Sequence, residues 1–224
     1  YVIKQVLDKH GYLDKKERSF IKRVTEGCIE RCIELDYILD SFSKVPAKKM
    51  KPLIRNLMRM SVYQIFYMDG TPDSAVCNEA VKLAGKRGFS SLKGFVNGVL
   101  RNIARNKDSV AYPDKEKDLT AYLSVIYSMP QWIVTLWTER FGTEKAEQIL
   151  QGLLTERPVT VRVEESLDRE KKEQLLKEMA EAGIAYTQVK DLPYAYELQN
   201  VDRVEMIPGF AEGLFLVQDE ASAM

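Results

Sequence analysis

The chain has 224 residues, which is enough for one or two domains. Hydrophobic residues make up 45% and charged residues 29%, and the net charge at pH 7 is zero, all ordinary values for a soluble globular protein. No apolar run approaches the ~20 residues that a membrane-spanning helix needs. No signal peptide is visible, although Tyr1 is not a natural start and residues are missing before it.

The first half of the sequence predicts helices. Asp14 and Glu17 have the spacing of a capping box, and apolar residues follow them at helical intervals as far as Leu39. A second helix is expected over 48–68. Thr71 and Pro72 then predict the N-cap and the first residue of a third helix.

A fourth helix is expected after the glycines that end the third. Ser90 or Ser91 is the predicted cap, and the following apolar residues keep the spacing of one helical face. Gly94 and Gly98 lie four residues apart, so we expect another helix to pack closely against them. Four helices with short connections indicate an all-α bundle over 1–106.

The second half has a different pattern. Residues 107–120 are polar and charged, which is typical of a linker. Residues 121–224 are predicted as one further region that begins with two short helices, the first starting at Pro130 and the second near 144–154.

A change of period from 3.6 to 2 follows Pro158. Alternating valines predict a strand at 159–163 and a helix is expected at 168–182. Short strands are expected near 184–189, 194–198 and 213–217. The predicted fold is therefore mainly α, with an all-α bundle followed by a small α+β domain.

The zero net charge hides two opposite halves. Residues 1–108 hold 21 Lys+Arg against 12 Asp+Glu, and residues 109–224 hold 12 Lys+Arg against 21 Asp+Glu. A basic first half indicates a polyanionic partner, because Lys and Arg that neutralise phosphates release counterions. A well-solvated surface, or attraction between the two halves, would produce the same asymmetry.

Two basic stripes and the end of the intervening helix carry the candidate RNA contacts. The first stripe is Lys48, Lys51, Arg55 and Arg59, and the second is Lys93, Asn97, Arg101 and Arg105; steps of three or four place each stripe on one helical face. The candidates are Lys48, Lys51, Arg55, Arg59, Lys82, Lys86, Arg87, Lys93, Arg101 and Arg105. Two alternatives stay open: cations at helix ends also suit the helix dipole, and Arg59, Glu79, Asn97 and Arg101 could pair inside the bundle.

No catalytic or metal constellation stands out in the sequence. Cys28 and Cys32 are four apart on an apolar helical face, and Cys77 lies beside Val76, so all three are interpreted as small buried residues. The single histidine, His10, leaves no zinc site. Too few cysteines for a disulfide framework indicate a reducing, cytoplasmic setting, and we expect neither a metal nor a membrane partner.

The segment 72–81 (PDSAVCNEAV), followed by 95–101 (FVNGVLR), resembles the signature of NusB-type antitermination domains. Arg59 with Tyr63 and Gln64 is similar to the preceding helix of that family. The resemblance covers residues 1 to about 106 and implies an RNA-binding helical domain.

The continuation resembles the region that precedes the catalytic domain in bacterial 16S rRNA cytosine-C5 methyltransferases of the RsmB/Sun type. The matching segments are 127–132, 157–163, 207–210 and 217–222. The resemblance implies an RNA-recognition-like α+β domain. Glu164 departs from the family, which usually has Asn there, so a polar contact at that position is not carried over.

The resemblance implies that the parent protein is an S-adenosylmethionine-dependent enzyme whose cofactor loop and catalytic cysteines lie beyond Met224. It assigns no catalytic, cofactor or metal residue to these 224 residues. Gln218 and Asp219 match the motif before the catalytic domain, where they either orient the cofactor pocket or make strand-end hydrogen bonds.

The implied role is rRNA targeting, with small-subunit rRNA as the partner and a ribosomal protein as a further candidate. The main alternative is a non-enzymatic NusB-related antitermination or RNA-binding adaptor. A protein–protein docking module is a third reading. A Gly-rich loop and two cysteines encoded past Met224 would favour the enzyme.

Overall fold

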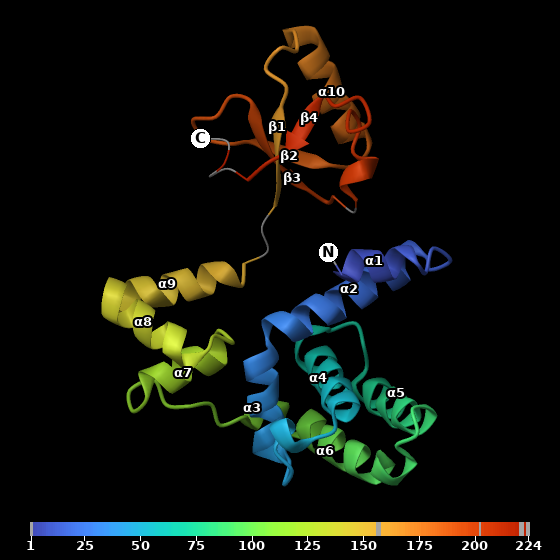
Figure 1. Ribbon diagram of the computed structural model, residues 1–224, viewed down its shortest axis with the longest axis vertical. Coiled ribbons are helices and arrows are strands. Elements are labelled where there is room, and N and C mark those ends of the chain that lie inside the picture. The colour runs from blue at the N-terminus through green and yellow to red at the C-terminus, as the bar shows by residue number, and fades with distance from the viewer. Residues whose placement is uncertain (1, 156–157, 202, 220–221, 223–224) are drawn as a thin grey trace. The chain divides into compact units, whose positions relative to one another are not determined.

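The computed structural model describes residues 2–155, 158–201, 203–219 and 222. It divides into two compact units, residues 1–154 and 155–224 (Figure 1). The described part of the first unit is helical, and a four-stranded sheet forms in the second. The predicted fold class, an all-α bundle followed by a small α+β domain, is confirmed.

The bundle contains helices that follow the predicted apolar pattern. Their bounds are α1 (Val2–Asp8), α2 (Lys15–Glu30), α3 (Cys32–Phe42), α4 (Pro52–Tyr67), α5 (Asp73–Lys86) and α6 (Lys93–Arg105), with 3-10 turns η1 (Ala47–Lys49), η2 (Ser90–Leu92) and η3 (Lys107–Ser109). The predicted capping box is confirmed: Asp14 Oδ1 accepts from Glu17 N at 2.8 Å, and Glu17 Oε2 accepts from Asp14 N at 3.0 Å. These two bonds satisfy amide groups that the helix itself leaves without partners.

The helix that the apolar pattern predicted as continuous is interrupted at Arg31, between α2 and α3. Arg31 is both the C-cap of α2 and the N-cap of α3, with φ −102°. Apolar residues of this segment have different environments: Val24 and Leu35 are 2% and 0% exposed, whereas Phe20 is 43% exposed. Periodicity alone does not show such a break, because the hydrophobic spacing continues through it.

Both predicted caps of the later helices are wrong. Pro72, with ψ 130°, is extended and is itself the N-cap of α5, so Thr71 lies outside the helix. Ser90 and Ser91 lie in η2, and α6 starts after Leu92 without a side-chain cap. In both places the chain approaches the helix in a conformation that the residue types alone do not specify.

The core of the bundle is formed by side chains from α3 to α6. The members that are 0% exposed are Leu35, Ile38, Leu39, Met58, Val62, Cys77, Ala84, Val96, Leu100 and Ile103. Burial of these side chains is the main force that holds the helices together, at about 25 cal/mol per Å² of apolar surface. The polar residues on the outer faces of α5 and α6 are therefore positioned by helices that pack on this core.

Three further helices complete the first unit: α7 (Leu119–Ile126), α8 (Gln131–Phe141) and α9 (Thr143–Leu153). They pack around Leu123, Val134 and Leu150. The structure differs here from the predicted domain division, because these helices belong to the same compact unit as the bundle and the chain divides after residue 154.

The segment 107–120, predicted as a linker, contacts the bundle. The Tyr112 ring stacks on Tyr37 with 6.0 Å between centroids, and Tyr37 donates to the carbonyl of Ala111 at 2.5 Å. Ile33 N also donates to Ser128 Oγ at 2.9 Å, which ties α3 to the turn after α7. Composition predicted exposure of this segment, whereas its tyrosine finds a partner that is distant in sequence.

The second unit is an antiparallel sheet with one long helix. Its elements are β1 (Val159–Val163), α10 (Arg169–Glu181), β2 (Ala185–Gln188), β3 (Ala195–Gln199), the turn η4 (Val204–Met206) and β4 (Phe215–Val217). The strand order is β2-β3-β1-β4, with every neighbouring pair antiparallel. Helix α10 packs on the sheet through Leu175 and Met179.

The other face of the sheet is polar at its centre. The register pairs Thr160 with Glu197 and Arg162 with Leu216, which puts these side chains on one face. None of these four positions carries an aromatic ring, so this part of the face offers no platform for stacking a base.

Among the helices that the structure describes in either unit, none has the length and hydropathy that crossing a membrane requires.

Candidate nucleic-acid interface

The ten candidate cations lie on helices or turns of the bundle. Three of them, Arg55, Arg59 and Arg101, are partly buried and the other seven are exposed. The structure therefore places most of this set where a large anion could reach it, and it holds the three arginines in more restricted environments.

A groove between α5 and α6 brings three of the candidates together. It has a volume of about 570 Å³. The lining residues are Asn78, Val81, Lys82, Lys93, Gly94, Asn97 and Arg101. Spacing of four residues along each helix produces this arrangement, since such residues share one face.

Arg101 organises the polar side of the groove. Its Nε donates to Asn97 Oδ1 at 2.9 Å, and its Nη2 donates to Asn78 Oδ1 at 3.2 Å. Asn97 is one turn earlier on α6, whereas Asn78 comes from α5, so the guanidinium bridges the two helices. Asn97 and Arg101, two of the residues for which pairing inside the bundle was an open alternative, thus bind each other at a partly buried position, and Asn78 is a groove residue that the sequence did not single out.

The two lysines of the groove are oriented differently. Lys82 donates to Glu79 at 2.7 Å, and this hydrogen bond lowers the pKa of the Glu79 carboxyl below its ordinary value. The expectation that Glu79 pairs inside the bundle is wrong, because both side chains are more than 60% exposed. Lys93 lies along Gly85: a Cβ added to that glycine would be 2.2 Å from Lys93 Cε.

The surface of α6 at its glycines is open. A Cβ added to Gly94 or Gly98 would meet nothing within 4 Å, apart from its own helix and its chain neighbours. The prediction that another helix packs against these glycines is therefore wrong for the described residues. The helices contact one another through the apolar face of α6; Gly94 lines the α5–α6 groove, and Gly98 is exposed on α6 one turn later, outside the groove lining.

A second group of cations lies around Phe89. Lys51 Nζ lies 5.3 Å from the centroid of the Phe89 ring, in cation–π geometry. Lys48 lies in η1 and Lys51 is the N-cap of α4, so the helix expected over 48–68 starts only at Pro52; Lys86 ends α5 and Arg87 is its C-cap, shortly before Phe89. The structure does not place these residues in the α5–α6 groove.

Arg59 is held by a partner within the bundle. Its Nε and Nη2 donate to the two carboxylate oxygens of Asp36 at 2.7 and 2.5 Å, a bidentate pair between α3 and α4. This hydrogen bonding raises the pKa of Arg59 above its ordinary value. The alternative of pairing inside the bundle is confirmed for Arg59, and Arg55 Nε, also on α4, is buried without a hydrogen-bond partner.

A buried carboxylate was missed by sequence reasoning. Glu34 is 4% exposed. Its Oε2 accepts from Tyr67 at 2.6 Å and from Arg31 at 2.9 Å, and its Oε1 accepts from Tyr112 at 3.3 Å. Burial and the neighbouring carboxylate raise the pKa values of Tyr67 and Tyr112. Arg31 is only three residues from Glu34, but the two tyrosines lie 33 and 78 residues away, so no local signal could have found the complete cluster.

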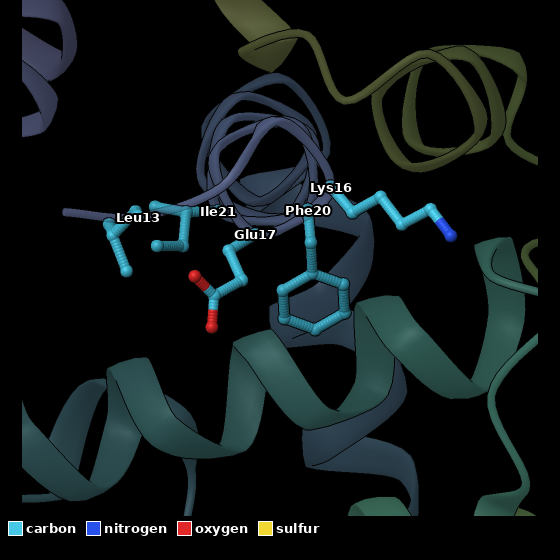
Figure 2. Close-up of a pocket in the computed structure, with 5 residues that line it drawn as sticks. All are labelled: Leu13, Lys16, Glu17, Phe20 and Ile21. Carbon is cyan, nitrogen blue, oxygen red and sulfur yellow. The ribbon is translucent and has the colours of Figure 1, made fainter. Parts of the chain in front are cut away.

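A separate hollow lies on α2, shown in Figure 2, and is lined by Leu13, Lys16, Glu17, Phe20 and Ile21. Its volume is about 500 Å³ and its lining is mostly apolar. Lys16 extends to the opposite side from Leu13 and Ile21 (Figure 2). Phe20 and Ile21 line this hollow and stay exposed, so they lie outside the core of the bundle.

Of the three cysteines predicted to be small buried residues, Cys77 is buried, and Cys28 and Cys32 are partly buried. Burial raises the pKa of Cys28 to about 12 and also raises the pKa of Cys77. Both therefore stay as neutral thiols, which fits the predicted structural role. The part of the chain that the structure describes contains no group of three or more His, Cys, Asp or Glu that could hold a metal ion.

Gln218 makes hydrogen bonds at the end of a strand. Its backbone N donates to the carbonyl of Thr160 at 3.1 Å, which extends the β1–β4 ladder, and its Nε2 donates to the carbonyl of Ser222 at 2.6 Å. Asp219 accepts from the backbone of Ser222 through its carbonyl at 2.9 Å. The strand-end alternative is thus observed for Gln218.

Two family models match the chain. The model described as the NusB family matches residues 2–105, and the model described as Methyltr_RsmF/B-like, ferredoxin-like domain matches residues 129–205. The chain therefore joins a helical domain of the NusB family to a ferredoxin-like domain, and the second match includes strands β1, β2 and β3.

Curated relatives carry both domains. The chain is 33% identical over 230 residues to the probable ribosomal RNA small subunit methyltransferase B of Bacillus subtilis, covering 100% of the chain and 48% of the relative. It is 28% identical to the probable protein of the same name from Synechocystis, covering 98% of the chain and 48% of the relative. The chain belongs to the RsmB/Sun-type family, over its amino-terminal portion.

The chain spans about half the length of the curated relatives it matches. Among solved structures, the crystal structure of PH0851 aligns with a TM-score of 0.68 and 16% identity, covering 97% of this chain and 48% of that one. At this identity the alignment shows a shared fold.

Proposed function

We propose that these 224 residues are the rRNA-binding portion of an S-adenosylmethionine-dependent 16S rRNA 5-methylcytosine methyltransferase. The names of the relatives and the share of their length that is matched support this assignment. In this proposal the cofactor pocket and catalytic residues lie outside the 224 residues, and the protein works in the cytoplasm on small-subunit rRNA.

The observation that carries the proposal is the α5–α6 groove. Lys82, Lys93 and Arg101 converge there with two amide side chains, on the face of a domain whose family was independently matched. Cations of this kind bind phosphates and set the position of an RNA, while base recognition is left to other parts of the protein. In this proposal the bundle binds the RNA backbone, and the rest of the longer protein recognises and modifies the base.

A salt titration of rRNA binding tests the proposal. The fragment is titrated with a transcribed 16S rRNA segment by fluorescence anisotropy across a range of salt concentrations, beside the longer protein. We expect affinity to fall with salt, with a log–log slope of about −2 to −3 if three phosphates are neutralised at about 0.7 to 0.9 each. Calorimetry should detect S-adenosylmethionine binding by the longer protein and none by the fragment.

A matched pair of variants localises the binding. Lys93→Gln removes a groove cation, and Lys145→Gln removes an exposed cation from α9, outside the groove. Lys93→Gln should weaken RNA binding and make the salt slope shallower by about one, while Lys145→Gln should change neither. An anisotropy that stays flat at all salt concentrations would sink the proposal.

The alternative is a non-enzymatic adaptor, or a bundle whose partner is a ribosomal protein. The apolar hollow on α2 favours the second, because apolar surface of this kind suits a protein partner better than RNA. That reading predicts binding to a ribosomal protein that tolerates salt, and no binding to RNA.

A further inference from the structure

The α5–α6 groove combines hydrogen-bond donors with a helix surface that lacks side chains. Gly94 lines the groove, and Gly98 lies one turn further along α6, next to the groove on the exposed surface of the helix; a Cβ at either would point into open space. Glycine in the middle of a helix is unfavourable compared with alanine. Two such residues on one exposed face suggest that something other than the helix's own stability favours a bare backbone there.

We propose that this groove is a phosphodiester site, where the RNA backbone lies directly on the glycine face of α6 and is held by Arg101. This inference rests on the proposed function, since it names the RNA group that the groove receives. Neither the family models nor the relatives assign a role to these residues.

The hydrogen bonds within the groove determine which atoms remain for a ligand. Arg101 uses Nε and Nη2 to bind the side-chain oxygens of Asn97 and Asn78. Each amide oxygen therefore faces the guanidinium, and each amide NH2 group is left as a donor, as is Arg101 Nη1. The ammonium group of Lys93, and the protons of the Lys82 ammonium that do not bind Glu79, are further donors.

An array of donors selects for an anion with several acceptor oxygens. A phosphodiester supplies two charged oxygens, and contacts to cationic donors are the stronger class of hydrogen bond. A base edge presents both donors and acceptors, and the two amide oxygens that could accept from it are engaged by Arg101. The site should accordingly bind RNA with little dependence on base sequence.

The position of Lys93 is set by another glycine. The lysine stem lies across Gly85 on α5, where a Cβ would approach Lys93 Cε to 2.2 Å. Gly85→Ala must therefore displace the ammonium group without changing any charge. A loss of affinity in this variant would reflect geometry rather than electrostatics.

The glycine face supplies a test in which binding and stability change in opposite directions. The double variant Gly94→Ala/Gly98→Ala keeps every charge and every donor, and replacing helical glycine by alanine should raise the melting temperature of the bundle. The added methyl groups should hold the RNA backbone away from α6 and weaken binding of a labelled oligouridylate about tenfold.

Gly152→Ala is the matched control. Gly152 lies inside α9 (Thr143–Leu153), and a Cβ there also meets nothing within 4 Å. This variant should raise the melting temperature in the same direction and leave the oligouridylate affinity unchanged. Arg101→Gln should weaken binding and make the salt slope shallower by about one, and oligouridylate and oligocytidylate should bind alike.

The possible results separate the two proposals. If the unaltered fragment binds RNA and the Gly94/Gly98 variant binds as tightly as Gly152→Ala, the groove site is wrong while rRNA binding stands. If the unaltered fragment binds no RNA at any salt concentration, or binds only a ribosomal protein, the proposed function fails and the groove site with it. Selective loss in the Gly94/Gly98 variant, with its folding intact, supports both.

Discussion

The two units of the chain carry net charges of opposite sign. Residues 1–154 hold 25 Lys+Arg against 18 Asp+Glu, and residues 155–224 hold 8 against 15. The first unit is thus suited to a polyanion and the second is not, since like charges repel. The division by structure keeps the asymmetry that the sequence halves showed, with opposite net charges of seven on the two units.

Their polar contacts differ as well. In the first unit, ion pairs and hydrogen bonds join residues that are distant in sequence, such as Arg59 with Asp36. In the described part of the second unit, the ion pairs of α10 are exposed and local: Arg169 with Glu173 is an (i, i+4) pair. Exposed pairs of that kind contribute little to stability. Both units therefore depend on an apolar core, and the first adds polar contacts between residues that are distant in sequence, such as the bidentate Arg59–Asp36 pair.

The largest expected effect comes from the buried carboxylate. Glu34→Ala leaves Arg31, Tyr67 and Tyr112 without their shared partner, and breaking a buried pair of this kind costs about 3 to 5 kcal/mol. Hydrogen exchange, measured segment by segment during a urea titration, should show this loss of stability in the first unit only. Glu30→Ala, an exposed position on α2, is the control; a loss below about 1 kcal/mol for Glu34→Ala would contradict the comparison.

The apolar core of the second unit gives the next effect. Leu198 on β3 is 1% exposed, so Leu198→Ala should lower the free energy of unfolding by about 3 kcal/mol. Leu216 on β4 is 55% exposed, and Leu216→Ala should change it by less than about 0.5 kcal/mol. Denaturation monitored in the second unit measures both variants. Equal losses would mean that packing does not distinguish the two faces of this sheet.

A smaller effect distinguishes Arg59 from the other candidate cations. Arg59→Gln breaks the bidentate pair with Asp36 and should destabilise the first unit by about 1 to 2 kcal/mol, because the pair is partly buried. Its RNA affinity should stay within about twofold, unlike that of Arg101→Gln. Parallel melting curves and anisotropy titrations check this. A large loss of RNA affinity with unchanged stability would instead show that Arg59 contacts RNA.

The smallest effect is a dependence on pH. Because burial raises the pKa of Cys28 from 9.0 to about 12, the folded chain keeps a proton that the unfolded chain loses above pH 9. The stabilising contribution is therefore full below pH 9 and is lost as the pH rises from 9 towards 12. Cys28→Ala should weaken this alkaline loss. Peptide mapping after iodoacetamide treatment at pH 8 should find Cys28 alkylated in urea and protected in the folded chain.

Local rules in the sequence were sufficient for much of the fold. Alternating valines and a helix-ending glycine predicted the strand–helix–strand–strand order of the second unit, because side-chain period depends only on backbone geometry. The capping box at Asp14 was equally local, since both hydrogen bonds join residues three apart. The family resemblance of residues 2–105 was also visible from one motif pair.

Tertiary structure decided which polar residues meet. Arg101 and Asn78 are 23 residues apart, and only the packing of α5 on α6 brings them within hydrogen-bond distance. The same holds for Glu34 and Tyr112, which made a predicted linker part of the first unit. A sequence pattern specifies the face of a helix, but not the neighbouring helix that the face meets, because that depends on how several apolar surfaces pack together. The sequence thus placed the cations of each stripe on one helical face, and the fold alone gathered Lys82, Lys93 and Arg101 into one groove.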